Sequence, residues 1–311
     1  MNGLDRKVEL RAFDGRTVLV TGAQGMLGSA FVEILQKLVP GAKVIAPSRV
    51  DLDVTRQEQV LSLERYYPDF IFHCALHTNV DWYEDHASEG LELARRGLEN
   101  VITLARRTGA RIFYPQSFLI YDGTLLPIDE RTEPRPLNAY GRVKWDCEQQ
   151  LRQELPQSLV VRLGGLFGGR EADKNFVGRI IPHMRSLICQ GVDRFEVGDR
   201  VWQPSYTHDL VFNILLLLAR DCEGSYCMAS HGQASFFELT REIAMLLDLD
   251  AHLQVVPVLA QAMAGREKAL RPVAAVMRNT ALQNARLDRQ RTWQSSLAEY
   301  LAQPFFQMRS I

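Results

Sequence analysis

Short apolar runs alternate with longer amphipathic stretches through the first half of the chain. Runs rich in β-branched and aromatic residues predict buried strands at residues 17–21, 43–46, 69–74, 111–114 and 158–163. Apolar residues at helical spacing between them predict helices at residues 26–39, 56–65, 84–108 and 140–154. Strands that alternate with helices form a parallel sheet covered on both faces. The pattern therefore predicts an α/β fold with a doubly wound parallel sheet.

The pattern of apolar residues changes after about residue 164. Helical spacing dominates at residues 176–190, 207–220 and 235–247, and strand-like pieces are short, at residues 195–197, 226–229 and 253–256. We interpret residues 15–168 as one domain and residues 169–311 mainly as a smaller, mostly helical C-terminal lobe. Residues 207–229 are expected to return and pack on the first domain.

Charge and cysteine usage exclude several kinds of partner. The 311 residues include 36 basic and 37 acidic side chains, so no basic excess is available for a nucleic-acid surface. The five cysteines form no C-x-x-C pair, which argues against a metal site and favours reduced thiols in the cytoplasm. The longest apolar stretch, residues 210–219, is shorter than the roughly 20 residues that cross a bilayer. We expect no membrane partner.

Gly22, Gly25 and Gly28 form a G-x-x-G-x-x-G turn between the first predicted strand and the next helix. In this context the first glycine allows a sharp turn, the second lets backbone approach a pyrophosphate, and the third lets helix pack closely on strand. The helix N-terminus supplies unpaired N–H groups for the phosphates. The turn predicts a Rossmann-type NAD(P)-binding domain; the alternative is a glycine turn without a ligand. The candidate cofactor-binding residues of the turn are Gly22, Gln24, Gly25, Met26, Leu27 and Gly28.

The end of the second predicted strand indicates which dinucleotide is bound. A site that prefers NAD usually places Asp or Glu there, where the carboxylate holds the ribose 2′-OH. This chain has Ser48 and Arg49 instead, which suit a 2′-phosphate through charge-assisted hydrogen bonds. We therefore expect NADPH as the cofactor, with NADH possible. The alternative for Arg49 is a solvated surface arginine.

Tyr140 and Lys144 form a Y-x-x-x-K pair at the start of a predicted helix, so both side chains lie on one helical face. A nearby cation stabilises tyrosinate and lowers the pKa of a tyrosine, which prepares it for acid–base work. Ser117 lies just past the fourth predicted strand, 23 residues before Tyr140. A Y-x-x-x-K pair by itself is weak evidence of a catalytic site, and the serine strengthens it. We take Ser117, Tyr140 and Lys144 as the candidate catalytic residues.

These residues together resemble an extended short-chain dehydrogenase/reductase. Further motifs make the chain similar to the dTDP-4-dehydrorhamnose reductase branch of that family, over about residues 15–300. These motifs lie at residues 51–55, 78–81 with Glu84, 116–123, 138–141, 175–176, 279–282 and 286–287.

The resemblance implies a reductase that acts on a nucleotide-linked 4-keto-6-deoxy sugar, in deoxysugar or surface polysaccharide biosynthesis. In such an enzyme Tyr140 protonates the keto oxygen while hydride arrives from the nicotinamide. Lys144 binds the nicotinamide ribose and tunes Tyr140, and Ser117 hydrogen-bonds the same keto oxygen. The resemblance also assigns cofactor contacts to Asp53, Val54, Ala75 and Thr78 and makes the C-terminal lobe the substrate-binding part, through Asn175 and Phe176.

Arg200 is a further candidate, because an arginine fork can grip the diphosphate of such a substrate. A surface ion pair is the alternative for this residue. The chain also departs from the family pattern at three positions. The acidic neighbour of the reaction centre is replaced by Phe118, an aromatic after the fifth strand by Gly165, and an asparagine in the long helix by Ala94. These changes leave the sugar, the nucleotide and the product stereochemistry open.

Two other functions stay open at this point. The same branch resembles the β subunit of methionine adenosyltransferase, a non-catalytic NADP-binding regulatory subunit. A nucleotide-sugar epimerase or dehydratase of the same superfamily is the third reading. The intact set of Ser117, Tyr140 and Lys144 favours the reductase. A homodimer is a possible assembly.

Overall fold

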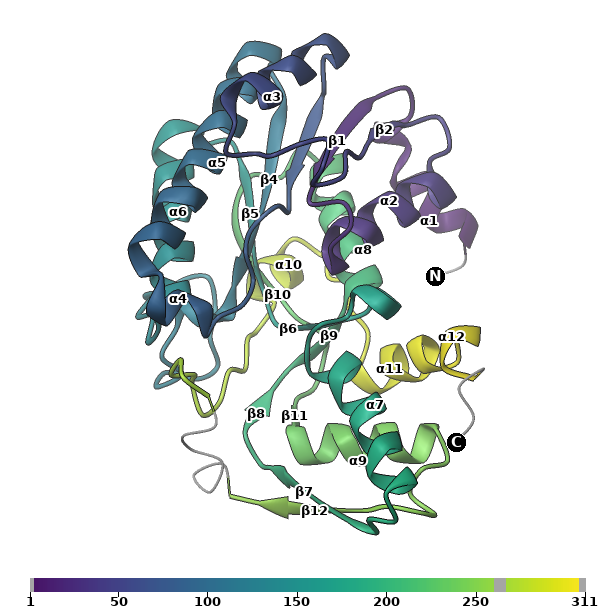
Figure 1. Cartoon of the computed structure of the whole chain (residues 1–311). Coiled ribbons are helices and arrows are strands. Elements are labelled where there is room, and N and C mark those ends of the chain that lie inside the picture. The colour runs from purple at the N-terminus through teal and green to yellow at the C-terminus, as the bar shows by residue number, and fades with distance from the viewer. Residues whose placement is uncertain (1–2, 260–266, 308–311) are drawn as a thin grey trace.

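The computed structural model describes residues 3–259 and 267–307. A six-stranded sheet lies at the centre of the first domain, and the C-terminal lobe lies below its lower edge (Figure 1). All neighbouring strands of this sheet run parallel. In the order of the sheet the strands are β10 (Gly224–Met228), β5 (Leu159–Leu163), β4 (Arg111–Ser117), β3 (Phe70–His73), β1 (Thr17–Thr21) and β2 (Lys43–Ile45). The predicted doubly wound α/β fold is confirmed.

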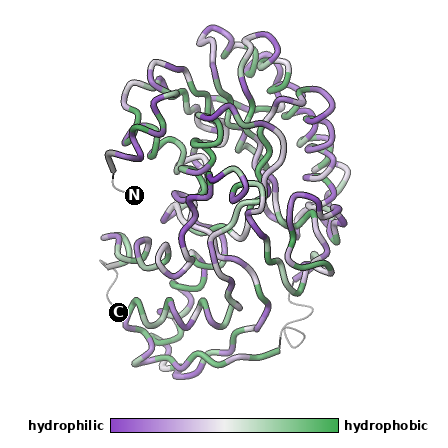
Figure 2. Tube along the Cα trace, turned by 180° about the vertical axis from the view of Figure 1, so that it is seen from behind, coloured by the Kyte–Doolittle hydropathy of each residue, from purple (hydrophilic) through white to green (hydrophobic). Residues whose placement is uncertain are grey.

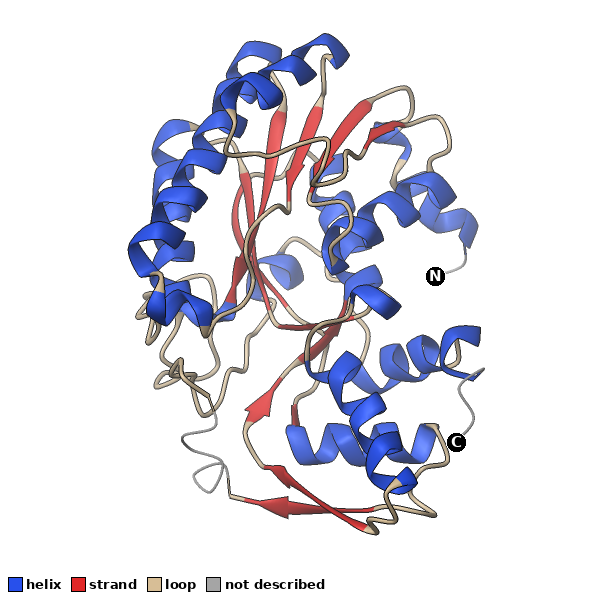
Figure 3. Cartoon of the chain, viewed as in Figure 1, coloured by secondary structure: helices blue, strands red, loops and turns tan. Residues whose placement is uncertain are grey.

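Helices cover both faces of the sheet, because side chains of each strand point alternately to opposite faces. Val18 and Val20 of β1 pack towards α2 (Met26–Leu38) and α8 (Thr207–Ala219). Leu19 points to the other face, which is covered by α3 (Gln57–Leu61), α5 (Ala87–Thr108) and α6 (Ala139–Glu154). Figure 2 shows the hydrophobic colour concentrated along the central strands, and Figure 3 shows the helices around them.

The segment from α8 to β10 belongs to the sheet of the first domain although it follows much of the C-terminal lobe in sequence. Strand β10 pairs with β5 at the edge of the sheet, and α8 packs against α2. Helix α8 is buried almost all round, which explains its long run of leucine and isoleucine. No helix in the described part of the chain has the length and apolar content to cross a bilayer.

The C-terminal lobe has its own aromatic and aliphatic core. Its helices are α7 (Phe176–Cys189), α9 (Phe236–Leu246), α11 (Trp293–Leu301) and α12 (Pro304–Gln307). Three two-stranded sheets complete it: β12 (Gln254–Val258) with β7 (Arg194–Gly198), β11 (Ala234–Ser235) with β8 (Val201–Trp202), and β6 (Gly165–Phe167) with β9 (Pro204–Tyr206). Helix α1 (Gly3–Glu9) and helix α10 (Thr280–Asn284) lie against the first domain.

Two predicted helices are interrupted. The helix predicted over residues 84–108 is wrong as one element, because it forms α4 (Trp82–Asp85) and α5 with His86 between them. His86 has non-helical backbone angles, and its ring stacks on Trp82 with centroids 4.4 Å apart. The helix predicted over residues 56–65 forms α3 and then a 3₁₀ turn, Ser62–Tyr66, which ends at Tyr67 in the left-handed region.

Candidate active site

The glycine turn lies where the carboxyl ends of β1 and β3 meet, at a switch point of the sheet. Gly22 has a φ of 68°, and a Cβ on it would lie 2.7 Å from the backbone nitrogen of Ala75. A Cβ on Gly28 would collide with the carbonyl oxygen of Gly22, so the helix can approach the strand only because residue 28 has no side chain. Both positions require glycine for reasons internal to the fold.

Gly25 is different, because it faces outward. It has an extended backbone, and a Cβ on it would contact only the carbonyl oxygen of Gly22, at 3.3 Å. Gly25 is the N-cap of α2, and no side chain caps the N–H groups of the first turn. Gln24 beside it is exposed, Met26 is half-buried and Leu27 is buried. An open, uncapped helix N-terminus next to a glycine is the geometry that binds a pyrophosphate.

The residues after β2 form an exposed turn beside this site. The Ser48 hydroxyl donates to Asp51 Oδ2 at 2.6 Å, and Arg49 is exposed. The Asp53 carboxylate accepts from the hydroxyl and backbone N–H of Thr55, which lowers the pKa of Asp53, and Arg56 and Arg49 add to this effect. The exposed Arg49 thus lies close enough to Asp53 for its charge to contribute to the lowered pKa of that carboxyl group.

Three further predicted cofactor residues occupy different environments. The carbonyl oxygen of Val54 accepts from Asn100 Nδ2 at 2.9 Å, which fixes this loop to α5. Ala75 directly follows the end of β3 and donates its N–H to Thr21 Oγ1 at 3.4 Å. Thr78 is exposed in the next turn of chain. Ala75 thus lies at the switch point, and Thr78 lies farther out.

Ser117 ends β4 and Tyr140 lies in the first turn of α6, and these two ends of the elements lie against each other. Ser117 is the last residue of β4, and its hydroxyl accepts from the Leu119 N–H at 3.2 Å. Asn138 caps α6 by accepting from Gly141 N at 2.7 Å. A Cβ on Gly141 would collide with the carbonyl oxygen of Leu119, so the start of α6 touches the turn that carries Ser117. Glu84 accepts from the Ala139 N–H at 2.8 Å, which also holds this end of α6.

Lys144 is buried under the same end of the sheet. Its Nζ donates to the carbonyl oxygen of Pro115 at 2.5 Å and lies 3.9 Å from the ring centroid of Tyr114. Burial lowers the pKa of Lys144 to about 8. Burial, with a smaller contribution from Cys147, raises the pKa of Tyr140 above its ordinary value. Desolvation therefore sets the direction of the Tyr140 pKa shift in this arrangement, and the lowering expected from Lys144 stays a prediction for the site with cofactor bound.

Gln116 connects Ser117 with Lys144, and no role was assigned to it from the sequence. It is buried, and its Oε1 accepts from the Ser117 N–H at 2.8 Å. Its Nε2 donates to the carbonyl oxygen of Lys144 at 2.9 Å and to Glu148 Oε2 at 2.8 Å. Glu148 is paired with the buried Arg162 at 2.8 Å. A polar residue at an inward position of β4 and a carboxylate four residues after Lys144 were the available signals.

The predicted substrate residues lie on the C-terminal side of the sheet. Asn175 is the N-cap of α7, and its Nδ2 donates to the carbonyl oxygen of Leu166 at 3.0 Å. The Phe176 ring packs with Phe236 at a centroid distance of 4.4 Å and with Trp202 at 6.2 Å. A Cβ on Gly165 would collide with the Trp202 indole, so this indole covers the position where the expected aromatic is missing.

Arg200 forms an ion pair. Its NH1 donates to Glu267 Oε2 at 2.7 Å. The alternative considered for this residue, an ion pair, is therefore present, and any grip on a diphosphate requires Glu267 to move. None of the hydrogen bonds among the described residues links Arg200 to Ser117, Tyr140 or Lys144.

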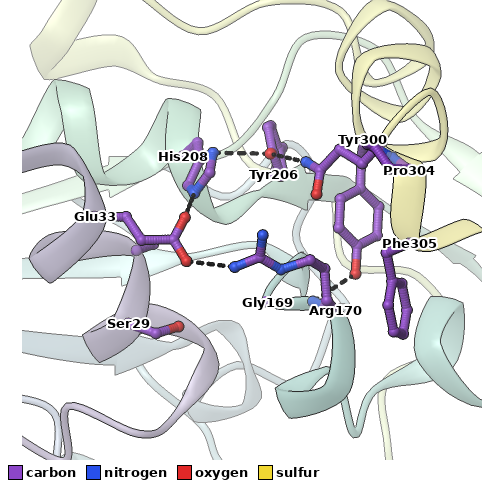
Figure 4. A pocket seen from close by; sticks show the side chains of 11 residues that line it. Ser29, Glu33, Gly169, Arg170, Tyr206, His208, Tyr300, Pro304 and Phe305 are labelled. Carbon is purple, nitrogen blue, oxygen red and sulfur yellow. Dashed lines mark hydrogen bonds and ion pairs between the residues drawn. The ribbon is translucent and has the colours of Figure 1, made fainter. Parts of the chain in front are cut away.

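A cavity of about 320 Å³ lies beside α2, away from Ser117, Tyr140 and Lys144 (Figure 4). Its wall carries a polar chain centred on Glu33, which accepts from Arg170 at 2.7 Å and lies 3.2 Å from His208 Nε2. His208 Nδ1 lies 2.8 Å from the Tyr206 hydroxyl. These residues join α2 to the C-terminal lobe. The cavity contains none of the candidate catalytic residues.

The parallel sheet and the glycine turn at its switch point are those of an extended short-chain dehydrogenase/reductase. Residues 16–305 match the family model described as the RmlD substrate binding domain, so the chain belongs to that family. A protein of Streptomyces niveus named dTDP-4-keto-6-deoxy-D-glucose reductase is 32% identical over 285 residues, covering 90% of this chain and 95% of the relative. The resemblance expected from the motifs is confirmed.

Solved structures agree with this assignment. A dTDP-4-dehydrorhamnose reductase from Clostridium acetobutylicum has a TM-score of 0.82 at 28% identity, over 92% of this chain and 98% of that one. The enzyme of the same name from Bacillus anthracis, solved in complex with NADP, has the same fold, with a TM-score of 0.82 at 24% identity and the same two coverages. Methionine adenosyltransferase 2 subunit beta of Danio rerio is also a relative, 27% identical over 253 residues and 76% of each chain.

Proposed function

We propose that this protein is an NADPH-dependent reductase of a nucleotide-linked 4-keto-6-deoxy sugar. The observation that carries the proposal is the arrangement where β4 ends and α6 begins. Gln116 hydrogen-bonds the backbone of both Ser117 and Lys144, and the first turn of α6, which carries Tyr140, lies against the turn that follows Ser117. The related reductases act, by their names, on dTDP-linked keto sugars. A sugar of this class carries a carbonyl that a phenol can protonate as a hydride reaches the carbon.

The residues around the glycine turn fit a dinucleotide. The uncapped N-terminus of α2 and the open face of Gly25 would hold the pyrophosphate. Arg49, exposed on the neighbouring turn, would bind the 2′-phosphate together with Ser48. Asp53, Val54, Ala75 and Thr78 would complete the adenosine and ribose contacts. The cofactor supplies the hydride. NADP bound to a structure of the same fold supports the choice of cofactor.

The chain's own residues donate the proton and stabilise the charge that develops as it is transferred. The raised pKa of Tyr140 keeps its phenol protonated at neutral pH, so it can donate to the keto oxygen. Lys144 is held by the carbonyl oxygen of Pro115. Its ammonium would bind the nicotinamide ribose of a bound cofactor and would stabilise the Tyr140 phenolate as the proton leaves. The Ser117 hydroxyl donates to the same keto oxygen, where negative charge develops. Gln116 hydrogen-bonds the backbone of Ser117 and of Lys144 and so fixes these two residues relative to each other.

We propose that residues 15–168 and 207–229 hold the cofactor and that the rest of the C-terminal lobe holds the nucleotide sugar through Asn175, Phe176 and Arg200. The five cysteines are free thiols, which supports the cytoplasm as the compartment. A homodimer is the assembly we propose to test by light scattering.

The test uses a panel of nucleotide-linked 4-keto-6-deoxy sugars and follows NADPH oxidation by stopped flow. Tyr140→Phe keeps the ring but removes the proton, so kcat should fall by about 10²–10⁴ with NADPH affinity unchanged. Tyr67→Phe is the control, because Tyr67 is exposed on a distant turn and should keep full activity. A regulatory subunit, the role suggested by the Danio rerio relative, would show no NADPH oxidation with any sugar. Equal rates for Tyr140→Phe and the wild type would refute the mechanism.

A further inference from the structure

Tyr83 of α4 is a buried tyrosine whose ring packs on the ring of Tyr140. The two ring centroids are 5.3 Å apart and the ring planes meet at 71°, which is an edge-to-face arrangement. Tyr83 is 1% exposed and belongs to the core between the sheet and helices α5 and α6. Tyr140 is only half-buried and packs against this core from outside. Tyr83 therefore limits the positions that the ring of Tyr140 can take.

The hydroxyl of Tyr83 connects the same side chain to the segment of chain that follows β3. It donates to the carbonyl oxygen of His77 at 3.0 Å. Burial raises the pKa of Tyr83, so its phenol keeps the proton and remains a donor. His77 lies between Ala75 and Thr78, two of the candidate cofactor residues. Tyr83 thus contacts the candidate acid with its ring and the candidate cofactor segment with its hydroxyl.

The neighbours of Tyr83 leave it little freedom to move. Helix α4 lies between the ends of α5 and α6 (Figure 1). A Cβ on Gly90 of α5 would lie 2.4 Å from Cε1 of Tyr83, so the ring fits only because residue 90 has no side chain. The Trp82 ring packs edge-on beside Tyr83, with centroids 5.2 Å apart. The next residue of α4, Glu84, accepts from the Ala139 N–H at the start of α6.

The ring of Tyr140 needs such a support. Proton transfer requires its hydroxyl within hydrogen-bond distance of the keto oxygen. A half-buried side chain on the first turn of a helix has more than one staggered rotamer open to it. The hydrogen bonds of Gln116 fix the backbone of Ser117 and Lys144, not the ring of Tyr140. The edge of the Tyr83 ring excludes the rotamers in which the two rings would overlap.

We propose that Tyr83 is a positioning residue, whose ring orients Tyr140 for proton transfer and whose hydroxyl holds residues 75–79 in place for the cofactor. The proposal rests on the proposed function for the role of Tyr140 and for the nature of the cofactor. The proton and the hydride must reach the two atoms of one carbonyl in a single geometry. A rigid side chain in contact with both sides of the site keeps that geometry. Because ring and hydroxyl have separate tasks, two substitutions can separate them.

The kinetic test compares Tyr83→Phe with Tyr83→Leu by stopped-flow NADPH oxidation and by calorimetric titration with NADPH. Tyr83→Phe loses one hydrogen bond but keeps the ring. It should bind NADPH about twofold to tenfold more weakly, with kcat nearly unchanged. Tyr83→Leu also loses the ring, so its kcat should fall by about tenfold to a hundredfold, with the KM of the sugar nearly unchanged.

Fluorine NMR of protein labelled with fluorotyrosine observes the ring of Tyr140 without any turnover. The Tyr140 resonance is the one that Tyr140→Phe removes. Tyr83→Leu should shift or broaden this resonance, because the ring then takes more than one orientation. Gly90→Ala should do the same, because its Cβ displaces the Tyr83 ring. If Tyr83→Leu does not fold, Gly90→Ala and Tyr83→Phe decide the question.

Tyr300→Phe and Tyr300→Leu are the matched controls. Tyr300 is also 1% exposed, and its hydroxyl also bonds to backbone, where it accepts from the Arg170 N–H at 3.0 Å. These variants lose the same atoms from a buried tyrosine of the C-terminal lobe. They should leave kcat, NADPH affinity and the Tyr140 resonance unchanged.

The proposal is overturned if Tyr83→Leu and Gly90→Ala leave the Tyr140 resonance unchanged, or if Tyr83→Phe binds NADPH as tightly as the wild type. It is also overturned if the Tyr300 variants lose as much kcat as those of Tyr83, because the effect is then a general loss of stability. The proposed function is judged separately, by NADPH oxidation of the wild type with the keto-sugar panel. If the wild type shows no oxidation, the reductase is refuted, and the NMR and NADPH titrations still decide whether Tyr83 orients Tyr140.

Discussion

A buried ion pair joins Glu148 of the candidate catalytic helix α6 to Arg162 of β5. Its removal tests how much this pair contributes to the free energy of unfolding. The two side chains are 0% and 3% exposed, and their nearest atoms are 2.8 Å apart. Glu148 also accepts from Gln116 at 2.8 Å and Ser225 at 3.2 Å, and Arg162 donates to the Tyr121 hydroxyl at 2.7 Å. The pair therefore connects α6 with β4, β5 and β10.

Glu148→Ala leaves the Arg162 guanidinium buried without its carboxylate. Breaking such a pair costs about 3–5 kcal/mol, a large part of the roughly 5–15 kcal/mol that stabilises a typical domain. Glu148→Gln keeps an acceptor at the same place and should cost less, about 1–3 kcal/mol. Glu148→Leu combined with Arg162→Met removes both charges together, and its cost should be below that of Glu148→Ala.

The assay is urea unfolding followed by circular dichroism at pH 7.5, with the three variants and the wild type. The expected order of stability is wild type, Glu148→Gln and then Glu148→Ala, with the double variant above Glu148→Ala. A loss below about 1 kcal/mol for Glu148→Ala, or a double variant less stable than this single one, would refute the assignment of a buried, mutually dependent pair.

The remaining predictions concern the cofactor site and its charge. Gly25→Ala should stay folded and lose NADPH affinity, whereas Gly28→Ala should lower the melting temperature because its Cβ collides with Gly22; equal melting curves would contradict this. Arg49→Ala should weaken NADPH by about 1–3 kcal/mol and leave NADH nearly unchanged in calorimetry, and equal losses would remove Arg49 from the 2′-phosphate. Because the pKa of Lys144 is lowered to about 8, its ammonium is lost above that pH, so kcat/KM should fall between pH 8 and 10; a flat profile there would contradict its role.

Sequence alone could predict the features that depend on neighbours in the chain. The uninterrupted apolar run of Val18, Leu19 and Val20 predicts a strand buried on both faces, because successive side chains of a strand point to opposite faces. The spacing of Tyr140 and Lys144 predicts one helical face for the same reason. The glycine turn could be predicted because the backbone at Gly22 and Gly28 has no room for a side chain, so few other residues can occupy these positions.

The features that only the tertiary structure decided depend on partners far away in the chain. From the sequence, Arg200 could equally be a phosphate ligand or a surface residue. The fold brings Glu267, 67 residues later, into an ion pair with its guanidinium. In the sequence Gln116 is an isolated polar residue, and only the packing of α6 on β4 gives it a hydrogen-bond partner in Lys144. Trp202 covers Gly165 from another strand. The direction of the Tyr140 pKa shift also depends on distant parts of the chain. Spacing in the sequence places a cation four residues away, but desolvation depends on all the residues that pack around the ring.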